Sequence, residues 1–166
     1  MAISQRDQKF LLRCEEIRQQ SHDPDRSVGV VIVDAEGQVV AEGTNAPPTV
    51  LGLTRDQSHE AIRQNPDWKY FVLEHAERNA IFSALTHGKS LRGATMYGTL
   101  FPCADCARAI AAAGISRLIV VGSSLDPSRD EKWLNHYRHA EHILAMAGIK
   151  ISVFDPTNAA SRMLNN

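Results

Sequence analysis

Hydrophobic residues follow two different spacings along this chain, and each spacing predicts a kind of element. Residues 4–20 place apolar side chains at helical intervals between charged ones, which predicts an amphipathic helix. The helix is expected to end at residues 23–25, where Asp-Pro-Asp disfavours its continuation. A β-branched run at residues 28–33 is too short for a helix and predicts a central strand, and residues 38–43 predict a second strand after the turn at 35–37. These two strands are expected to pair as a hairpin.

The second half of the chain alternates strands with helices. Strands are predicted at residues 94–100, 118–121 and 149–154, and helices at residues 75–87, 103–113 and 129–147. Helical connections make consecutive strands parallel, whereas the leading hairpin is antiparallel. The expected fold class is therefore α/β, with a mixed five-stranded sheet and helices on both faces.

Residues 45–69 form the longest stretch without a clear period, and contain two prolines at 47–48. Irregular stretches of this length within a compact domain are usually functional or disordered. Three aromatic residues near its end, Trp68, Tyr70 and Phe71, predict that this end packs against the body of the protein.

Composition places the chain among ordinary soluble domains. Its 166 residues are 43% hydrophobic and carry a net charge of −1, which predicts a single domain over residues 1–166, with a core at 4–154 and a loose C-terminal tail. Such a charge does not suggest the basic face that nucleic-acid binding usually needs.

Residues 1–6 are not followed by the apolar run of a signal peptide, and no apolar stretch approaches the ~20 residues of a membrane span. Three unevenly placed cysteines favour free thiols and a cytoplasmic location.

Two segments carry residues typical of a metal site. One offers His75 and Glu77, and the other offers Cys103 and Cys106 directly after a proline. One imidazole and two thiolates suit Zn²⁺, and three protein ligands leave its fourth position open for water, as in catalytic zinc sites. We therefore expect one catalytic Zn²⁺ per chain, with Glu77 as the catalytic proton carrier.

The predicted helices restrict where this metal can lie. Cys103 and Cys106 project from one side of a first helical turn, whose partial positive charge favours thiolates. His75 and Glu77 would diverge by about 200° within a helix, so the metal is expected beyond the N-terminal end of their helix. Together the segments resemble the signature of zinc deaminases, which implies hydrolytic deamination: zinc lowers the pKa of a water while Glu77 carries protons to the ring nitrogen and the departing amine.

The same segments resemble the motifs of a known family. Residues 75–81 (His-Ala-Glu-Arg-Asn-Ala-Ile) resemble the HAExNAI of deoxycytidylate (dCMP) deaminases, in the cytidine deaminase-like superfamily, and residues 99–107 resemble their TLFPCxxCA. The pair His-x-Glu and Pro-Cys-x-x-Cys is a signature of zinc deaminases. Residues 23–33 resemble the family's DP…VGAVIV, and the similarity covers about residues 20–150.

This resemblance implies a three-layer α/β/α cytidine deaminase-like fold and assembly into a homo-oligomer. It implies that His75, Cys103 and Cys106 bind the catalytic zinc and that Glu77 transfers protons. The expected function is deamination of a cytosine nucleotide or nucleoside, with dCMP to dUMP preferred. The alternatives are a free base or another amino-heterocycle, adenosine in tRNA, or a non-catalytic zinc-stabilised oligomer module. Near-neutral charge counts against tRNA, and a purely structural site would not need Glu77.

The sequence departs from the family's GYNGxPxG at residues 43–50, which read Gly-Thr-Asn-Ala-Pro-Pro-Thr-Val. Asn45 resembles the family's substrate-contacting asparagine, and we expect it to bind the substrate together with Ala76. Two family glycines are replaced, which removes close backbone approach to phosphate and argues against regulation by dCTP.

Three cations in or beside the long stretch are candidates for phosphate contact, although exposed cations are usually only solvated: Arg55, Arg63 and Lys69.

The last predicted helix carries two groups of residues for which structural roles are expected. His136, His139 and His142 are spaced by three and are expected on a solvated or subunit-interface face. Trp133 and Tyr137 are expected in the core or in a subunit contact rather than at a base-stacking position.

Overall fold

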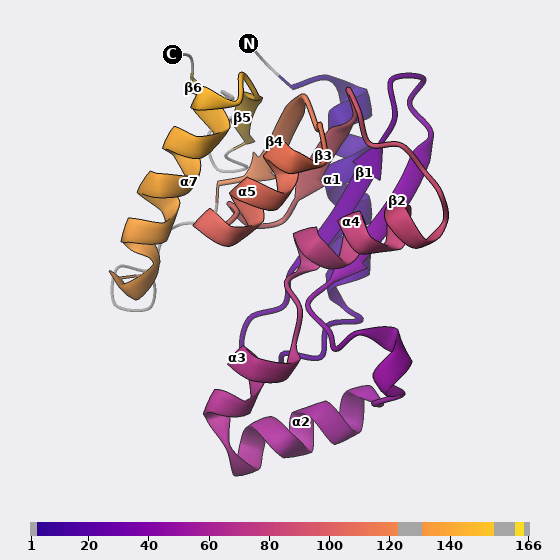
Figure 1. Cartoon of the computed structure of the whole chain (residues 1–166), viewed down its shortest axis with the longest axis vertical. Coiled ribbons are helices and arrows are strands. Elements are labelled where there is room, and N and C mark those ends of the chain that lie inside the picture. Colours follow the sequence, from indigo (N-terminus) through magenta and orange to yellow (C-terminus); the bar gives the residue numbers. More distant parts are fainter. Residues whose placement is uncertain (1–2, 123–130, 155–161, 165–166) are drawn as a thin grey trace.

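The structure is a computed structural model of the whole chain, and its described residues are 3–122, 131–154 and 162–164 (Figure 1). Its strands are β1 (Gly29–Val33), β2 (Val39–Thr44), β3 (Thr95–Gly98), β4 (Arg117–Val121), β5 (Lys150–Phe154) and β6 (Arg162–Leu164). They form one mixed sheet in the order β2-β1-β3-β4-β5-β6. β3, β4 and β5 are mutually parallel, whereas β2 and β3 are antiparallel to β1, and β6 to β5. The predicted fold class, hairpin and parallel strands are confirmed, and β6 is a short additional strand.

The helices cover the sheet and extend beyond it. They are α1 (Gln5–Arg18), α2 (Arg55–Gln64), α3 (Lys69–Val72), α4 (Ala76–Thr86), α5 (Ala104–Ala112) and α7 (Leu134–Met146), with 3₁₀ turns η1 (Thr49–Leu51), η2 (Pro66–Trp68) and η3 (Glu131–Trp133). Within the described ranges, none of these helices has both the length and the apolar character needed to cross a membrane. The start of the predicted 129–147 helix, residues 129–130, lies outside the described residues.

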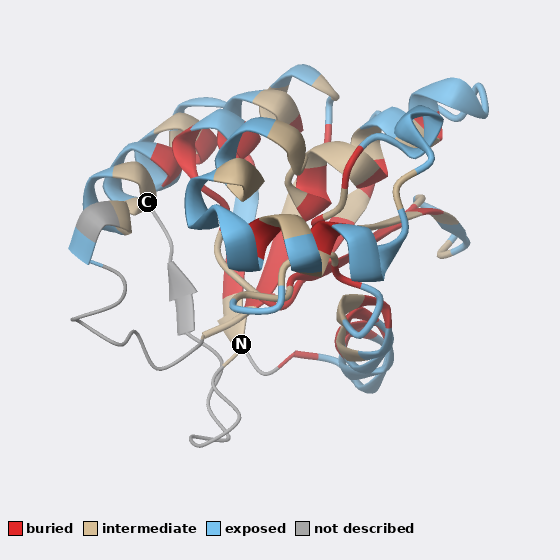
Figure 2. Cartoon of the chain, turned by 90° about the horizontal axis from the view of Figure 1, so that it is seen from below, coloured by how far each residue is buried: buried red, intermediate tan, exposed pale blue. Residues whose placement is uncertain are grey.

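Both faces of the sheet are buried because successive strand residues point to opposite sides. On β1, Val30 and Ile32 belong to the core shared with α4, α5 and α7, whereas Val31 and Val33 belong to the core shared with α1. Figure 2 shows that burial is concentrated on the sheet and on the inward sides of the helices. The result is three layers, α/β/α, in which the described residues place α1 on one face of the sheet and α4, α5 and α7 on the other.

Helix α2 lies inside the stretch 45–69, where an irregular chain was expected, so that expectation is wrong. The helix begins with a capping box: the Thr54 hydroxyl accepts the N–H of Gln57, and the Gln57 side chain accepts the N–H of Thr54. This reciprocal cap satisfies two N–H groups that a helix start leaves without partners. The pattern Thr-x-x-Gln is visible in the sequence, but the prolines around it favour a loop.

We call residues 49–72 the arm, because they project from the body of the molecule between β2 and α4 (Figure 1). The two segments that flank the arm are joined at its base, where Ala46 and Glu74 form an isolated antiparallel bridge with N···O distances of 3.2 and 3.0 Å. The aromatic end of the arm is not packed down as expected, since Phe71 is 86% exposed and Tyr70 51% exposed.

A buried carboxylate joins α1 to the sheet. Asp7 is 3% exposed, and its oxygens accept hydrogen bonds from Ser4, from the Tyr97 hydroxyl at 2.8 Å and from Arg117 at 3.3 Å. Burial alone would raise the pKa of Asp7, but the hydrogen bonds and the nearby guanidinium outweigh it, and the pKa is lowered. The ionised carboxylate therefore stabilises the folded state.

We expect Asp7→Asn to lower the free energy of unfolding at pH 7 by about 2–3 kcal/mol, because hydrogen bonds to a charged partner are lost. The folded-state pKa of Asp7 is depressed, so its contribution is present above the unfolded pKa of about 3.9 and is lost as pH falls through the lower folded value. Urea unfolding at several pH values should show the gap between wild type and variant closing below about pH 4. Glu36→Gln, on an exposed turn, is the control, and an equally large effect there would contradict the assignment.

Candidate active site

The metal-site histidine stands at the entrance of α4 rather than within it. His75 is the N-cap residue, with extended backbone angles (φ −70°, ψ 149°), and α4 begins at Ala76. This extended residue removes the divergence that would separate His75 from Glu77 inside a helix. The predicted arrangement, with the site beyond the N-terminal end of the helix, is present.

The two cysteines are placed in the same way by α5. Cys103 is the N-cap residue of α5 after β3 and Pro102, and Cys106 lies in the first turn of the helix. The Nδ1 atom of His75 lies 3.5 Å from the Cys103 sulfur and 3.4 Å from the Cys106 sulfur. Two helix N-termini thus bring one nitrogen and two sulfur atoms together, all within 4.8 Å of one another.

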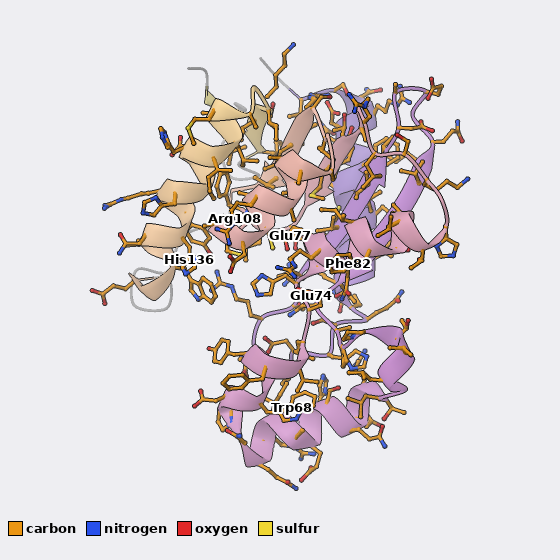
Figure 3. The ribbon with its side chains drawn as sticks, in the orientation of Figure 1. Trp68, Glu74, Glu77, Phe82, Arg108 and His136 are labelled. Atoms are coloured by element: carbon orange, nitrogen blue, oxygen red, sulfur yellow. The ribbon has the colours of Figure 1, made fainter. Side chains whose placement is uncertain are left out.

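Glu77 lies against this group. Its Oε2 is 3.4 Å from the sulfur of Cys106, and the residue is 7% exposed. Figure 3 shows Glu77 at the centre of the molecule, where α4 and α5 come together. Burial raises the pKa of the Glu77 carboxyl, as expected for a group that both accepts and releases protons near neutral pH.

The electrostatics of the cluster fit a divalent cation. The hydrogen bond from Cys106 lowers the pKa of Cys103 to about 4, whereas the hydrogen bond to Cys103 and burial raise the pKa of Cys106. The hydrogen bond to Cys103 raises the pKa of His75 to about 9. Two thiolates side by side repel each other, and a bound cation removes that repulsion and deprotonates the second thiol. Among the described residues, this group has one imidazole, two sulfur atoms and no fourth protein ligand, which fits zinc in an open site.

A cavity of about 470 Å³ opens onto these residues. Its volume lies in the range of sites that bind small molecules. The walls of the cavity come from distant segments of the chain, and they include Asn45, Leu73, Ala76, Phe101, Trp133, His136 and Tyr137.

For three residues that line this cavity, the sequence analysis predicted other positions. Trp133 and His136 lie next to each other, with ring centroids 5.2 Å apart, and the Trp133 ring lies 6.5 Å from that of His75, edge to face. Tyr137 contacts Phe101 edge to face at 6.1 Å. A solvated or interface face was expected for His136, and the structure places it in the lining of the cavity on α7 (Figure 3), whereas His139 is exposed. Spacing along α7 could not reveal this, because it does not tell which face meets the site.

Both expected substrate-binding residues line the cavity, but the amide of Asn45 is mostly used within the protein. Its Oδ1 accepts hydrogen bonds from the Ser21 hydroxyl (2.7 Å) and the Val28 N–H (2.9 Å), and its Nδ2 donates to the Arg26 carbonyl (2.8 Å). Ala76 is 1% exposed at the first position of α4. Asn45 therefore holds the wall of the cavity in shape as well as facing it.

The three cations that were candidates for phosphate contact differ in their positions and in their partners. Lys69 lines the cavity and forms ion pairs with Asp23 at 3.2 Å and Asp25 at 2.9 Å. Arg55 donates to the carbonyl of Gln19, and Arg63 pairs with Glu60 on the exposed side of α2. Neither arginine is among the residues that line the cavity.

Gly43 allows β2 to pack directly against the start of α4. A Cβ atom at this position would lie 2.4 Å from the carbonyl oxygen of Ala76 and 2.6 Å from the N–H nitrogen of Ala80. These are backbone atoms and cannot move without shifting the helix. The absence of a side chain at Gly43 thus helps to fix the position of His75 and Glu77.

An α/β/α sheet with a His-Cys-Cys cluster and a buried carboxylate at two helix N-termini defines a zinc-dependent hydrolytic deaminase. The profile of one family, described as the cytidine and deoxycytidylate deaminase zinc-binding region, matches residues 4–122. Deoxycytidylate deaminase from Pongo abelii is 34% identical over 140 residues, which cover 83% of this chain and 73% of the relative. The human deoxycytidylate deaminase is 34% identical over 138 residues, with the same coverage. The chain belongs to the cytidine and deoxycytidylate deaminase family, and zinc is its cofactor.

A solved structure shows the same fold. The dCMP deaminase of cyanophage S-TIM5, in complex with dCMP and dUMP, superposes with a TM-score of 0.66 at 20% identity, covering 93% of this chain and all of the other. At this identity the similarity bears on the fold alone.

We expect Gly43→Ala to weaken both zinc retention and folding, because the added methyl group pushes against the backbone that carries His75 and Glu77. Strain of this kind costs about 1–3 kcal/mol or more. Gly98→Ala is the matched control, since its Cβ would meet its nearest neighbour at 3.4 Å, an ordinary contact. Thermal unfolding and metal analysis of both variants measure the effect, and equal behaviour would contradict the tight packing at Gly43.

We expect zinc binding at pH 7 to release about two protons, because His75 and Cys106 are protonated there whereas Cys103 is already a thiolate. The apparent zinc affinity should therefore rise with pH. Calorimetric titration of zinc into chelator-treated protein, repeated in buffers of different ionisation enthalpy, counts the protons. Binding without proton release would contradict these protonation states of the three ligands.

Proposed function

We propose that this protein is a zinc-dependent deaminase that converts dCMP to dUMP and releases ammonia. Curated relatives that are 34% identical and named deoxycytidylate deaminase support this substrate. The single observation that carries the chemistry is the buried Glu77 carboxylate, whose Oε2 lies 3.4 Å from the sulfur of Cys106 at the edge of the His75–Cys103–Cys106 group. A site that only stabilised the fold would have no use for that carboxylate.

In this proposal, three residues bind the metal and a fourth transfers protons. His75, Cys103 and Cys106 hold the zinc, which when bound lowers the pKa of the attacking water. Glu77 accepts a proton from the water and delivers it to the ring nitrogen beside the attacked carbon. It then takes the second proton from the hydroxyl group now on that carbon and passes it to the departing amine, which leaves as ammonia as the carbonyl group forms. The raised pKa of Glu77 suits a group that holds a proton between these two steps.

The remaining expectations belong to the same proposal. Asn45 and Ala76 contact the substrate from the cavity wall, and the partner is a small-molecule nucleotide. The protein works in the cytoplasm as a homo-oligomer, and residues 1–166 act as one deaminase domain. Analytical ultracentrifugation of the zinc-loaded protein tests the oligomer directly.

A substrate panel tests the reaction itself. The zinc-loaded protein is offered dCMP, CMP, deoxycytidine, cytosine, adenine and guanine, and ammonia release is measured. Release from dCMP supports the proposal. Release from a free base alone would move the assignment to another amino-heterocycle, and the absence of release from every compound with zinc bound would overturn it.

We expect Glu77→Gln to keep its zinc and to lose turnover, because the amide preserves the shape of the side chain but cannot carry a proton. General acid–base groups contribute about 10²- to 10⁴-fold to rates, so kcat should fall at least that far. Metal analysis and steady-state kinetics measure both properties. Glu60→Gln makes the same chemical change on the exposed side of α2, and should match the wild type. A Glu77→Gln variant with substantial kcat would contradict the role of this carboxylate.

A further inference from the structure

We propose that His22 is a positioning residue that fastens the arm to the body of the protein through Ser58, and that the arm loosens when His22 takes up a proton. The arm, residues 49–72, carries part of the cavity wall, so this attachment bears on how the substrate is bound. The attachment itself does not depend on the reaction. Its kinetic consequence rests on the proposed deamination of dCMP.

The arm is attached to residues 19–25, the segment that follows α1, by polar contacts from three places along its length. Arg55 donates to the carbonyl of Gln19 at 2.7 Å, the Ser58 hydroxyl lies 2.7 Å from Nδ1 of His22, and Lys69 pairs with Asp23 at 3.2 Å and Asp25 at 2.9 Å. The segment is itself held to the body, because the N–H of His22 donates to the Asn45 carbonyl at 3.0 Å. The arm is therefore fastened to a fixed base.

Of these contacts, the one between His22 and Ser58 includes a fully buried side chain. Ser58 is 0% exposed, whereas Arg55 is exposed and Lys69 comes from α3, at the other end of the arm. Ser58 and Ile62 lie four residues apart and form the buried face of α2. This helix has 10 residues, and helices shorter than about 12–15 residues are only marginally stable alone. The structure of α2 thus depends on how well this face is held.

Helix α2 presents positive charge to His22, from Arg55 and from His59. Burial first, and then the charges of His59 and Arg55, lower the pKa of His22 below its ordinary value. The carboxylates of the segment after α1 do not compensate, because they are paired with Lys69. A proton on Nδ1 also makes this atom a donor only, so that it can no longer accept the hydroxyl proton of Ser58. Proton uptake by His22 therefore weakens the attachment of α2.

The attachment is expected to weaken on the acidic side of neutrality. With the arm released, His22 has the ordinary histidine pKa of about 6.5, and with the arm attached its pKa is lower. The contribution of His22 to the attachment is therefore complete above about pH 6.5 and is lost as pH falls through the lower value.

The surfaces that meet at this attachment also form one wall of the cavity. Lys69 and Tyr70 of the arm line the cavity, as do Asp23 and Asp25 of the segment after α1. The metal-binding group and Glu77 come instead from the starts of α4 and α5. A looser arm therefore disturbs a wall that surrounds the substrate while the reacting groups stay in place. We expect KM to change more than kcat.

Hydrogen exchange of the α2 amides tests the attachment without any substrate. The zinc-loaded protein is compared at about pH 7.5 and about pH 5.5, on either side of the ordinary histidine pKa, with correction for the intrinsic effect of pH on exchange. In the wild type, protection of α2 should fall on acidification, by up to about tenfold for each pH unit between the attached and released pKa values of His22. Zinc content is measured at both pH values.

Two variants separate the imidazole of His22 from the hydroxyl of Ser58. His22→Asn keeps a polar group near the place of Nδ1 but cannot take up a proton, so protection of α2 should lose most of its dependence on pH. Ser58→Ala removes the hydroxyl, and protection of α2 should be lower than in the wild type even at the higher pH. His139→Asn and Ser90→Ala make the same changes at exposed positions and should match the wild type.

Kinetics with dCMP test the consequence for the substrate. Ser58→Ala should raise KM for dCMP by about 2- to 10-fold, the effect of one lost hydrogen bond, with kcat little changed. On acidification, KM of the wild type should rise further than KM of His22→Asn. The phosphate of dCMP also titrates near pH ~6, and the comparison of the two proteins at each pH cancels that effect.

The outcomes separate this inference from the proposed function. A wild type whose α2 is equally protected at both pH values, or a folded His22→Asn variant that keeps the wild-type dependence on pH, overturns the inference and leaves the deaminase intact. An arm that loosens while KM for dCMP stays unchanged overturns the positioning role of His22. A protein that does not act on dCMP overturns the proposed function, and hydrogen exchange then still decides whether His22 holds the arm.

Discussion

The site depends on one geometric constraint, which is that a histidine and a glutamate two residues apart must face the same point. Within a helix they could not, because that separation turns them about 200° apart. The chain solves this by ending the extended backbone at His75 and starting α4 at the next residue. The same solution is used at Cys103, the N-cap of α5. Two helix starts at one edge of the sheet supply the ligands, and the sheet's packing keeps the two starts together.

The metal-site residues are held in precise positions because the helices pack closely against the sheet. Small residues face the sheet from α4, where Ala76, Ala80 and Ala84 are all buried. Gly43 lets β2 pack against the first turn of this helix without a side chain between them. The ligand geometry is thus set by backbone packing, which is rigid, rather than by long side chains, which would have to be ordered at an entropic cost.

Much of the fold and the centre of the site could be predicted from the sequence. Strands β1 and β4 are recognisable as β-branched runs, and the helix after Cys103 as an alanine-rich segment. The ligand group followed from residue types and spacing, because metal chemistry admits few combinations. What could not be predicted depends on tertiary contacts. His136 faces the cavity because α7 packs beside α5, and the wall near Arg26 keeps its shape because Asn45, distant in sequence, donates to the Arg26 carbonyl. Helix α2 was missed for a local reason, since a capping box was outweighed by nearby prolines.

The bridge between Ala46 and Glu74 has a consequence for how this chain can vary. It brings the two ends of the arm together next to His75 by backbone hydrogen bonds, which do not depend on what the intervening residues are. Closing a longer loop adds little entropic cost once its ends are joined in this way. The arm can therefore become shorter or longer, or be replaced by another segment, while the metal-site residues keep their positions. Since Lys69 and Tyr70 of the arm line the cavity, such exchanges offer a route to new substrates on an unchanged catalytic framework.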